Sequence, residues 1–115
     1  MSLLRLKRFD KAKELLRRKI PVARRVLGEN DDNLLRMRRN YAIALYKGDA
    51  TLDDFREAVA TLEDTTRTMR RVLGGSHPTT TETERELLIA RAALARAINS
   101  SRSVSVVVGL SLIHI

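Results

Sequence analysis

The sequence predicts an all-α protein built from stacked antiparallel helical hairpins, a fragment of an α-solenoid. Apolar residues recur at helical spacing in four segments, and none alternates at strand spacing. The pentapeptide Arg-Arg-Val-Leu-Gly occurs twice, at residues 24–28 and 70–74. A length of 115 residues suits one small domain. Within the chain we distinguish a helical repeat region, residues 1–98, from a tail, residues 99–115.

The first helical segment is expected to end at Gly28, since glycine commonly closes a helix. Proline removes a helical hydrogen bond and clashes with the preceding turn, at a cost of about 3 kcal/mol. We therefore expect Pro21 to kink or break this helix near Lys19. The predicted apolar face comprises Ala12, Leu15, Leu16, Ala23, Val26 and Leu27.

The second helix is predicted from about Asn33 to Tyr46, after the polar turn "GENDDN". Its inward face is expected to contain Leu34, Met37, Tyr41, Ala42 and Leu45.

The third helix is expected to start at a capping box, in which Thr51 and Asp54 satisfy each other's backbone N–H groups. It should end at Gly74. Its predicted apolar face contains Phe55, Ala58, Val59, Leu62, Met69, Val72 and Leu73. After the turn "SHPTTT" a fourth helix is predicted from about Thr81 to Ala97, with Leu87, Leu88, Leu94 and Ala95 inward.

The repeated pentapeptide is part of a longer internal match at an offset of 46 residues. Chance would not place apolar matches on corresponding faces of two successive helices, so the match indicates an internal repeat. The matched pairs include Phe9 with Phe55, Ala12 with Ala58, Leu16 with Leu62, Arg39 with Arg85, Ile43 with Ile89, and Ala44 with Ala90.

These residues resemble the tetratricopeptide (TPR) repeats of the kinesin light chain type. The matching pieces are Leu73-Gly74, His77-Pro78-Thr79, Asn40-Tyr41-Ala42, Leu45-Tyr46, and the packing residues Ala58 and Leu62. The resemblance covers residues 9–97. The offset of 46 exceeds the repeat length of this family, and we expect an insertion in the turn "YKGDATLDD" to account for the difference.

The resemblance implies a protein–protein interaction module that binds peptide segments of a partner in a concave groove. In this family the first helix of each pair lines the groove. The corresponding residues are Arg36, Arg39, Asn40, Ile43, Tyr46 and Lys47, and in the next copy Glu82, Arg85, Glu86, Ile89, Ala92 and Ala93. Three cations and an amide around an apolar strip favour an acidic peptide; the alternative is that these arginines are simply solvated.

The distribution of charge leaves a second function class open. The net charge of +8 arises in residues 1–28, which hold ten bases and two acids, whereas the other 87 residues hold 12 of each sign. A basic helix can bind nucleic acid or an anionic membrane through its charge. No nucleic-acid-binding motif or interleaved aromatic residues accompany it, so we favour the protein-binding hypothesis.

No residues are spaced as a catalytic or metal-binding constellation, so we expect no enzyme activity, cofactor, metal or small-molecule substrate. His77 is interpreted as a turn residue, and carboxylate pairs such as Asp31 with Asp32 as helix caps. The chain has no cysteine, which fits a reducing cytoplasmic setting, and no apolar run of membrane-spanning length.

The tail "SSRSVSVVVGLSLIHI" lacks the charge and helical period of the preceding residues. We expect it to be disordered or non-native, with a β-prone, aggregation-prone composition. Residues 110–115 resemble the translation of a transposon end used to prepare sequencing libraries, in which case the natural chain continues differently. The alternative is a natural hydrophobic C-terminus.

Overall fold

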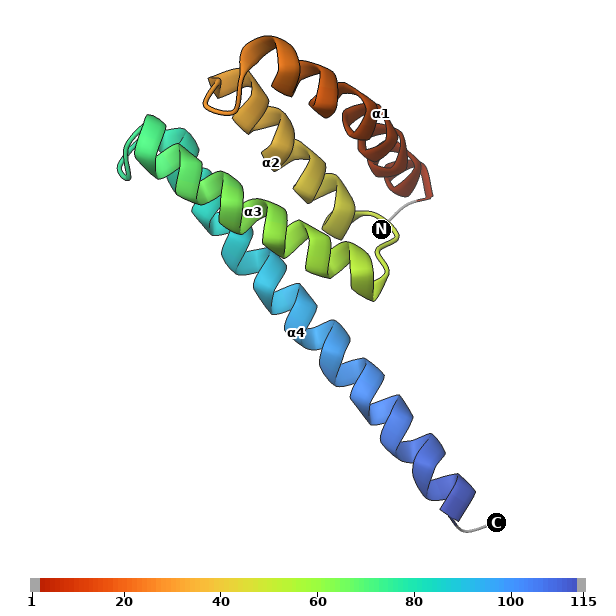
Figure 1. Cartoon of the computed structure of the whole chain (residues 1–115). Coiled ribbons are helices and arrows are strands. Elements are labelled where there is room, and N and C mark those ends of the chain that lie inside the picture. Colours follow the sequence, from red (N-terminus) through yellow and green to blue (C-terminus); the bar gives the residue numbers. More distant parts are fainter. Residues whose placement is uncertain (1–2, 114–115) are drawn as a thin grey trace.

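The computed structural model describes the backbone of residues 3–113 and the side chains of residues 7–100. It contains four helices, α1 (Leu3–Leu27), α2 (Asp32–Lys47), α3 (Leu52–Val72) and α4 (Pro78–Ile113), and no strand within those backbone limits (Figure 1). This confirms the predicted all-α stack of helical hairpins.

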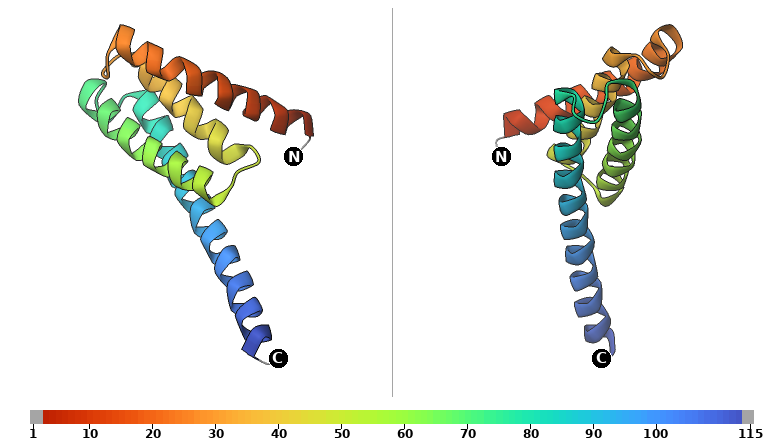
Figure 2. Two further views of the ribbon diagram at one scale, coloured as in Figure 1. Left: turned by 45° about the vertical axis from the view of Figure 1, so that its right-hand side comes forward. Right: turned by 90° about the vertical axis from the view of Figure 1, so that its left-hand side faces the viewer.

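The helices pack as a layered stack in which α2 is central. Helix α2 packs against α1, α3 and α4, and α3 also packs against α4. Among the described helices α1 touches only α2, and the C-terminal part of α4 extends beyond the other three (Figure 2). One whole side of α1 is therefore left without a helical neighbour.

The hydrophobic core lies between α2, α3 and α4. It contains Tyr41, Ala42, Leu45, Tyr46, Ala58, Val59, Leu62, Leu87 and Ala90, and Leu16 and Ile20 of α1 pack against its edge. Most of the predicted inward residues of α2 and α3 are therefore confirmed.

Several apolar residues that we predicted to be inward are exposed. They are Leu15, Val26 and Leu27 on α1, Val72 on α3, and Leu88 and Ala95 on α4. Leu88 is 65% exposed because Leu87 and Ala90 occupy the buried face of α4. The residues on α1 are exposed because this helix has a single packed neighbour.

Helix α1 runs without interruption through Pro21, so of the predicted kink or break only the break is wrong, and the kink stays a prediction. Pro21 cannot donate the backbone hydrogen bond that would reach the turn before it. Leu16 and Ile20 before the proline pack against the core edge, and Ala23 after it is buried. Packing on both sides of Pro21 thus compensates for the missing hydrogen bond.

Both copies of the repeated pentapeptide end a helix with a glycine at positive φ, but the backbone hydrogen bonds of the two glycines differ. Gly28 has φ of +88° and Gly74 has φ of +98°, a region that favours glycine. The Gly28 N–H donates to the carbonyl of Arg24 at 3.0 Å, and the Gly74 N–H donates to that of Met69 at 3.2 Å. The pentapeptide therefore marks a helix C-terminus in both places.

Side-chain caps start α2 and α3. The Asp31 carboxylate accepts from the backbone N–H groups of Asn33 and Leu34 at 2.8 and 3.3 Å. Thr51 and Asp54 form the predicted capping box, with bonds of 3.1 and 3.0 Å. These local bonds set where each helix begins.

Helix α4 is longer than predicted at both ends. It starts at Pro78, because proline suits the first helical position and the Nδ1 atom of His77 accepts from the Thr79 N–H at 3.1 Å. It continues past Ala97 to Ile113, so the backbone of residues 99–113, which we expected to be disordered or non-native, is helical. The segment has no adjacent strand, and its valines lower helix propensity only slightly. Residues 114–115 lie outside the described part, and the adapter origin of residues 110–115 stays a prediction.

Candidate functional site

Most of the predicted groove residues lie on the side of the stack where α2 and α4 meet. Arg39 and Ile43 of α2 face Glu82, Arg85 and Glu86 of α4 across a hollow of about 340 Å³. This hollow brings together residues of two helices that the sequence places at least 39 positions apart. All five of its lining residues are among the predicted groove residues.

A second hollow follows along the same two helices toward the C-terminus of α2. It has a volume of about 640 Å³ and a mostly apolar lining. The lining residues are Tyr46, Lys47, Gly48, Phe55, Ile89, Ala93, Arg96 and Ala97. We call the two hollows together the α2–α4 face. Ile43 in the first and Ile89 in the second supply its apolar strip.

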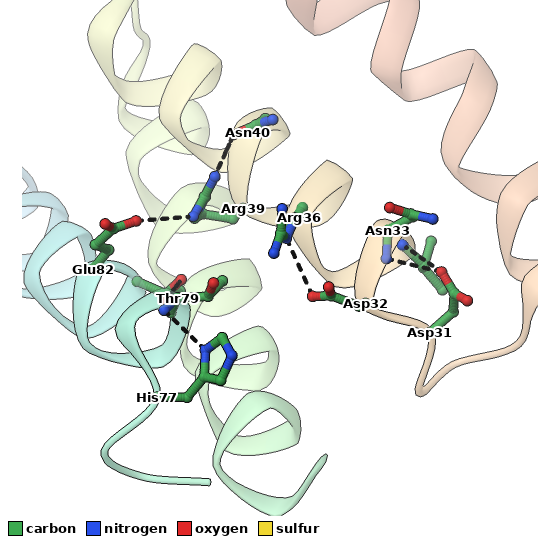
Figure 3. A network of polar contacts seen from close by, with 11 residues as sticks. Asp31, Asp32, Asn33, Arg36, Arg39, Asn40, His77, Thr79 and Glu82 are labelled. Atoms are coloured by element: carbon green, nitrogen blue, oxygen red, sulfur yellow. Dashed lines mark hydrogen bonds and ion pairs between the residues drawn. The ribbon is translucent and has the colours of Figure 1, made fainter. Parts of the chain in front are cut away.

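The structure pairs the three cations that we predicted for the first copy with carboxylates. Arg36 lies 3.2 Å from Asp32 of its own helix, and Arg39 lies 3.6 Å from Glu82 of α4 (Figure 3). Lys47 lies 3.9 Å from Glu86. The α2–α4 face therefore carries both signs of charge instead of an uninterrupted basic strip.

Arg85 and Arg96 have no ion-pair partner among the residues whose side chains are described. Both line the α2–α4 face. They are consequently the cations of this face that are most available to an incoming carboxylate. The ion pairs of Arg39 and Lys47 are partly exposed, so each contributes little stability, on the order of 0–1 kcal/mol, and an incoming carboxylate can compete for the two cations.

Tyr46 is a core residue and not a free groove residue. Its side chain is buried, and its hydroxyl donates to the Glu86 carboxylate. Burial, together with this hydrogen bond, raises the pKa of the Tyr46 phenol well above its ordinary value. The phenol therefore stays protonated and holds Glu86 against α2, next to Lys47.

Asn40 and Arg36 do not line the α2–α4 face. Asn40 lies on the opposite flank of α2, where it lines a hollow of about 410 Å³ between α1 and α2. Its Oδ1 atom accepts from Arg39 at 3.4 Å. Arg36 is exposed beside Asp32 (Figure 3). Of the twelve predicted groove residues, nine thus line the α2–α4 face, and Arg36, Asn40 and Ala92 do not.

Comparison of the chain with protein-family models, with curated proteins and with solved structures returned no match. The resemblance to kinesin light chain-type repeats therefore rests on the residues quoted above.

The residues that fasten α2 to α3 were not identified from the sequence. Arg38 pairs with Asp64, and the side chain of Arg38 is only 10% exposed. The Tyr41 hydroxyl donates to Glu57 and accepts from Arg17 Nη2 at 3.1 Å. Burial is the main cause of the raised pKa of Tyr41, and the Arg38 guanidinium lowers the pKa of Asp64. Single charged residues in helices carry no sequence signal for such pairings.

Two further observations concern the described part of the chain. It contains no group of three or more His, Cys, Asp or Glu residues placed to hold a metal ion. None of its helices is both long and apolar enough to span a bilayer.

Proposed function

We propose that this chain is a protein–protein interaction module that holds a peptide segment of a partner on the α2–α4 face. The observation that carries the proposal is the pair of successive hollows, which combine an apolar strip with available arginines. The resemblance to kinesin light chain-type TPR repeats supports the same kind of surface.

The chemistry of the face favours a peptide with apolar side chains and at least one carboxylate. Ile43 and Ile89 offer apolar contact, while Arg85 and Arg96 offer planar guanidinium groups that can form two hydrogen bonds with a carboxylate. Because the cations are exposed, binding should weaken as salt is raised.

The test is to select peptides from a random synthetic library on the full chain and measure their affinity for variants. Ile89→Asp should abolish binding, whereas Leu88→Asp should leave it unchanged. Both residues are exposed on α4, but only Ile89 lines a hollow. Equal affinities for the two variants would contradict the proposal.

The rival hypothesis, binding of nucleic acid through α1, is tested with a duplex DNA probe. Arg18→Glu combined with Arg25→Glu changes two exposed cations of α1 that lie outside the α2–α4 face. Tight DNA binding that is lost in this variant, with no selected peptide that depends on Ile89, would favour the nucleic-acid hypothesis.

A further inference from the structure

The internal repeat relates one flank of α1 and α2 to the surface of α3 and α4 on which α2 packs. At the offset of 46 residues, α1 matches α3 and α2 matches α4. Helix α2 packs against both α3 and α4, whereas no described helix packs in the equivalent place against α1 and α2. Figure 1 shows this flank along the outer side of the stack.

Corresponding residues are packed in the core in one copy and line hollows in the other, although the small side chains of Ala23 and Ala44 are themselves only 8% and 4% exposed. Ala58, Leu62 and Ala90 are fully buried in the core that includes Tyr41 and Leu45 of α2. Their counterparts line the 410 Å³ hollow; these are Ala12, Leu16 and Ala44.

The same relation continues toward the other end of α1. Thr65, Met69 and Thr83 are fully buried. Their counterparts Lys19, Ala23 and Met37 line a second hollow of about 400 Å³, together with Arg18, Val22, Val26 and Leu27. We call the two hollows between α1 and α2 the α1–α2 groove. Val26 is 76% exposed there, so the groove presents a substantial apolar surface.

The α3–α4 surface that α2 covers and the α1–α2 groove differ in the charge of the polar groups around them. Helix α2 is held by carboxylates: Glu57 accepts from Tyr41, Asp64 binds Arg38, Glu82 binds Arg39, and Glu86 binds Tyr46 and Lys47. The counterparts of these four carboxylates beside the α1–α2 groove are Lys11, Arg18, Arg36 and Asn40.

Three of the four carboxylates are thus replaced by cations, and the fourth by an amide. Lys11 and Arg18 are exposed and have no ion-pair partner among the described side chains. Arg36 already has Asp32 as a partner. Of the three substituted cations, Lys11 and Arg18 are therefore the ones that a bound partner would neutralise.

We propose that the α1–α2 groove binds an amphipathic helix of a partner protein that carries acidic residues along its polar flanks. The bound helix lies as α2 lies on α3 and α4, with its apolar face in the two hollows and its carboxylates beside Lys11 and Arg18. The occupant is not α2 of a second copy, because Arg38 and Arg39 of that helix would meet cations. This surface adjoins the α2–α4 face and shares Ile43 with it, but its other lining residues are different, so the inference goes beyond the proposed peptide site.

The test uses two labelled peptides with the sequence of α2, residues 32–47, and the full-length chain as receptor. One peptide is native, and the other carries the changes R36E, R38E, R39E and K47E. Both peptides have the same apolar face, so any difference in affinity reports charge. In fluorescence anisotropy the acidic peptide should bind at least about tenfold more tightly than the native one. Equal affinities, or no binding of the acidic peptide up to about 1 mM, would overturn the proposal.

Receptor variants locate the bound peptide. Lys11→Glu combined with Arg18→Glu should lower the affinity for the acidic peptide about tenfold and raise that for the native peptide. The matched control, Arg85→Glu with Arg96→Glu, makes the same charge change on the α2–α4 face and should leave both affinities unchanged. All four residues are exposed, and circular dichroism checks that helix content is retained.

The two sites can be told apart by these variants. Loss of acidic-peptide binding in the Arg85 and Arg96 variant alone would place the peptide on the α2–α4 face and refute this inference. Loss in the Lys11 and Arg18 variant alone, with library-selected peptides still dependent on Ile89, would support both proposals independently.

Discussion

Two leucines at corresponding repeat positions should differ sharply in their contribution to stability. The side chain of Leu62 on α3 is completely buried in the core between α2 and α4. Its counterpart Leu16 on α1 packs against α2 only and lines the 410 Å³ hollow. The two residues thus provide a comparison in which residue type and repeat position are the same.

Truncation to alanine has a different physical cost at each site. Leu62→Ala loses the transfer free energy of its side chain and leaves a cavity, so the free energy of unfolding should fall by about 3 kcal/mol. Leu16→Ala only widens a hollow that is already open to solvent. Without the cavity contribution the loss should be about 1 kcal/mol.

Urea unfolding followed by circular dichroism measures both changes. The slope of the free energy against urea should stay constant, so that the midpoints can be compared directly. Thermal melts should shift by roughly 4 °C for each kcal/mol. Equal losses at the two sites would mean that α1 is covered on its second side, and would refute the reasoning for an open α1–α2 groove.

Three further predictions concern the helix ends and the ion pairs. Gly74→Ala should cost about 1 kcal/mol because of the positive φ, whereas Gly75→Ala should be nearly neutral; urea midpoints of the two variants check this. The pKa of Asp64 is lowered in the folded state by Arg38, so the stability from this pair is present above the ordinary carboxyl pKa of 3.8 and is lost as the pH falls below it. Asp64→Asn should therefore make urea midpoints less dependent on pH between about 4 and 2, and an unchanged dependence would contradict this. Deletion of residues 101–115 should reduce the helical signal and improve solubility without lowering the melting temperature; a large loss of stability would show that this part of α4 is packed.

The sequence predicted the existence and type of all four helices, together with most of their ends. The caps at Asp31 and Thr51 and the glycines at 28 and 74 act on backbone groups only a few residues away. Such short-range effects can be predicted from residues that are close in the sequence. The start of α4 was missed because the cap by His77 and the role of Pro78 as a first helical residue were not recognised.

The continuity of α1 through Pro21 was not predictable from propensity. The local penalty of proline is real, but packing on both sides of it decides whether the helix breaks. The continuation of α4 to Ile113 was likewise missed, because a valine-rich segment without a clear period does not distinguish a helix from a strand.

For the candidate site, the sequence by itself determined which residues share a face of α2 and which residues of α4 correspond to them in the repeat, since spacing along a helix decides which residues share a face. Only the tertiary structure decided what these residues meet. Arg39 pairs with Glu82, and Lys47 with Glu86, across the contact between two helices that are far apart in the chain. The tertiary structure also decided that Val26 is exposed. Helix α1 has apolar residues on two sides but packs against one helix, α2, so the residues on its other side stay uncovered. A helical period shows which residues can be buried, whereas the number and charge of the surrounding helices determine which of them are.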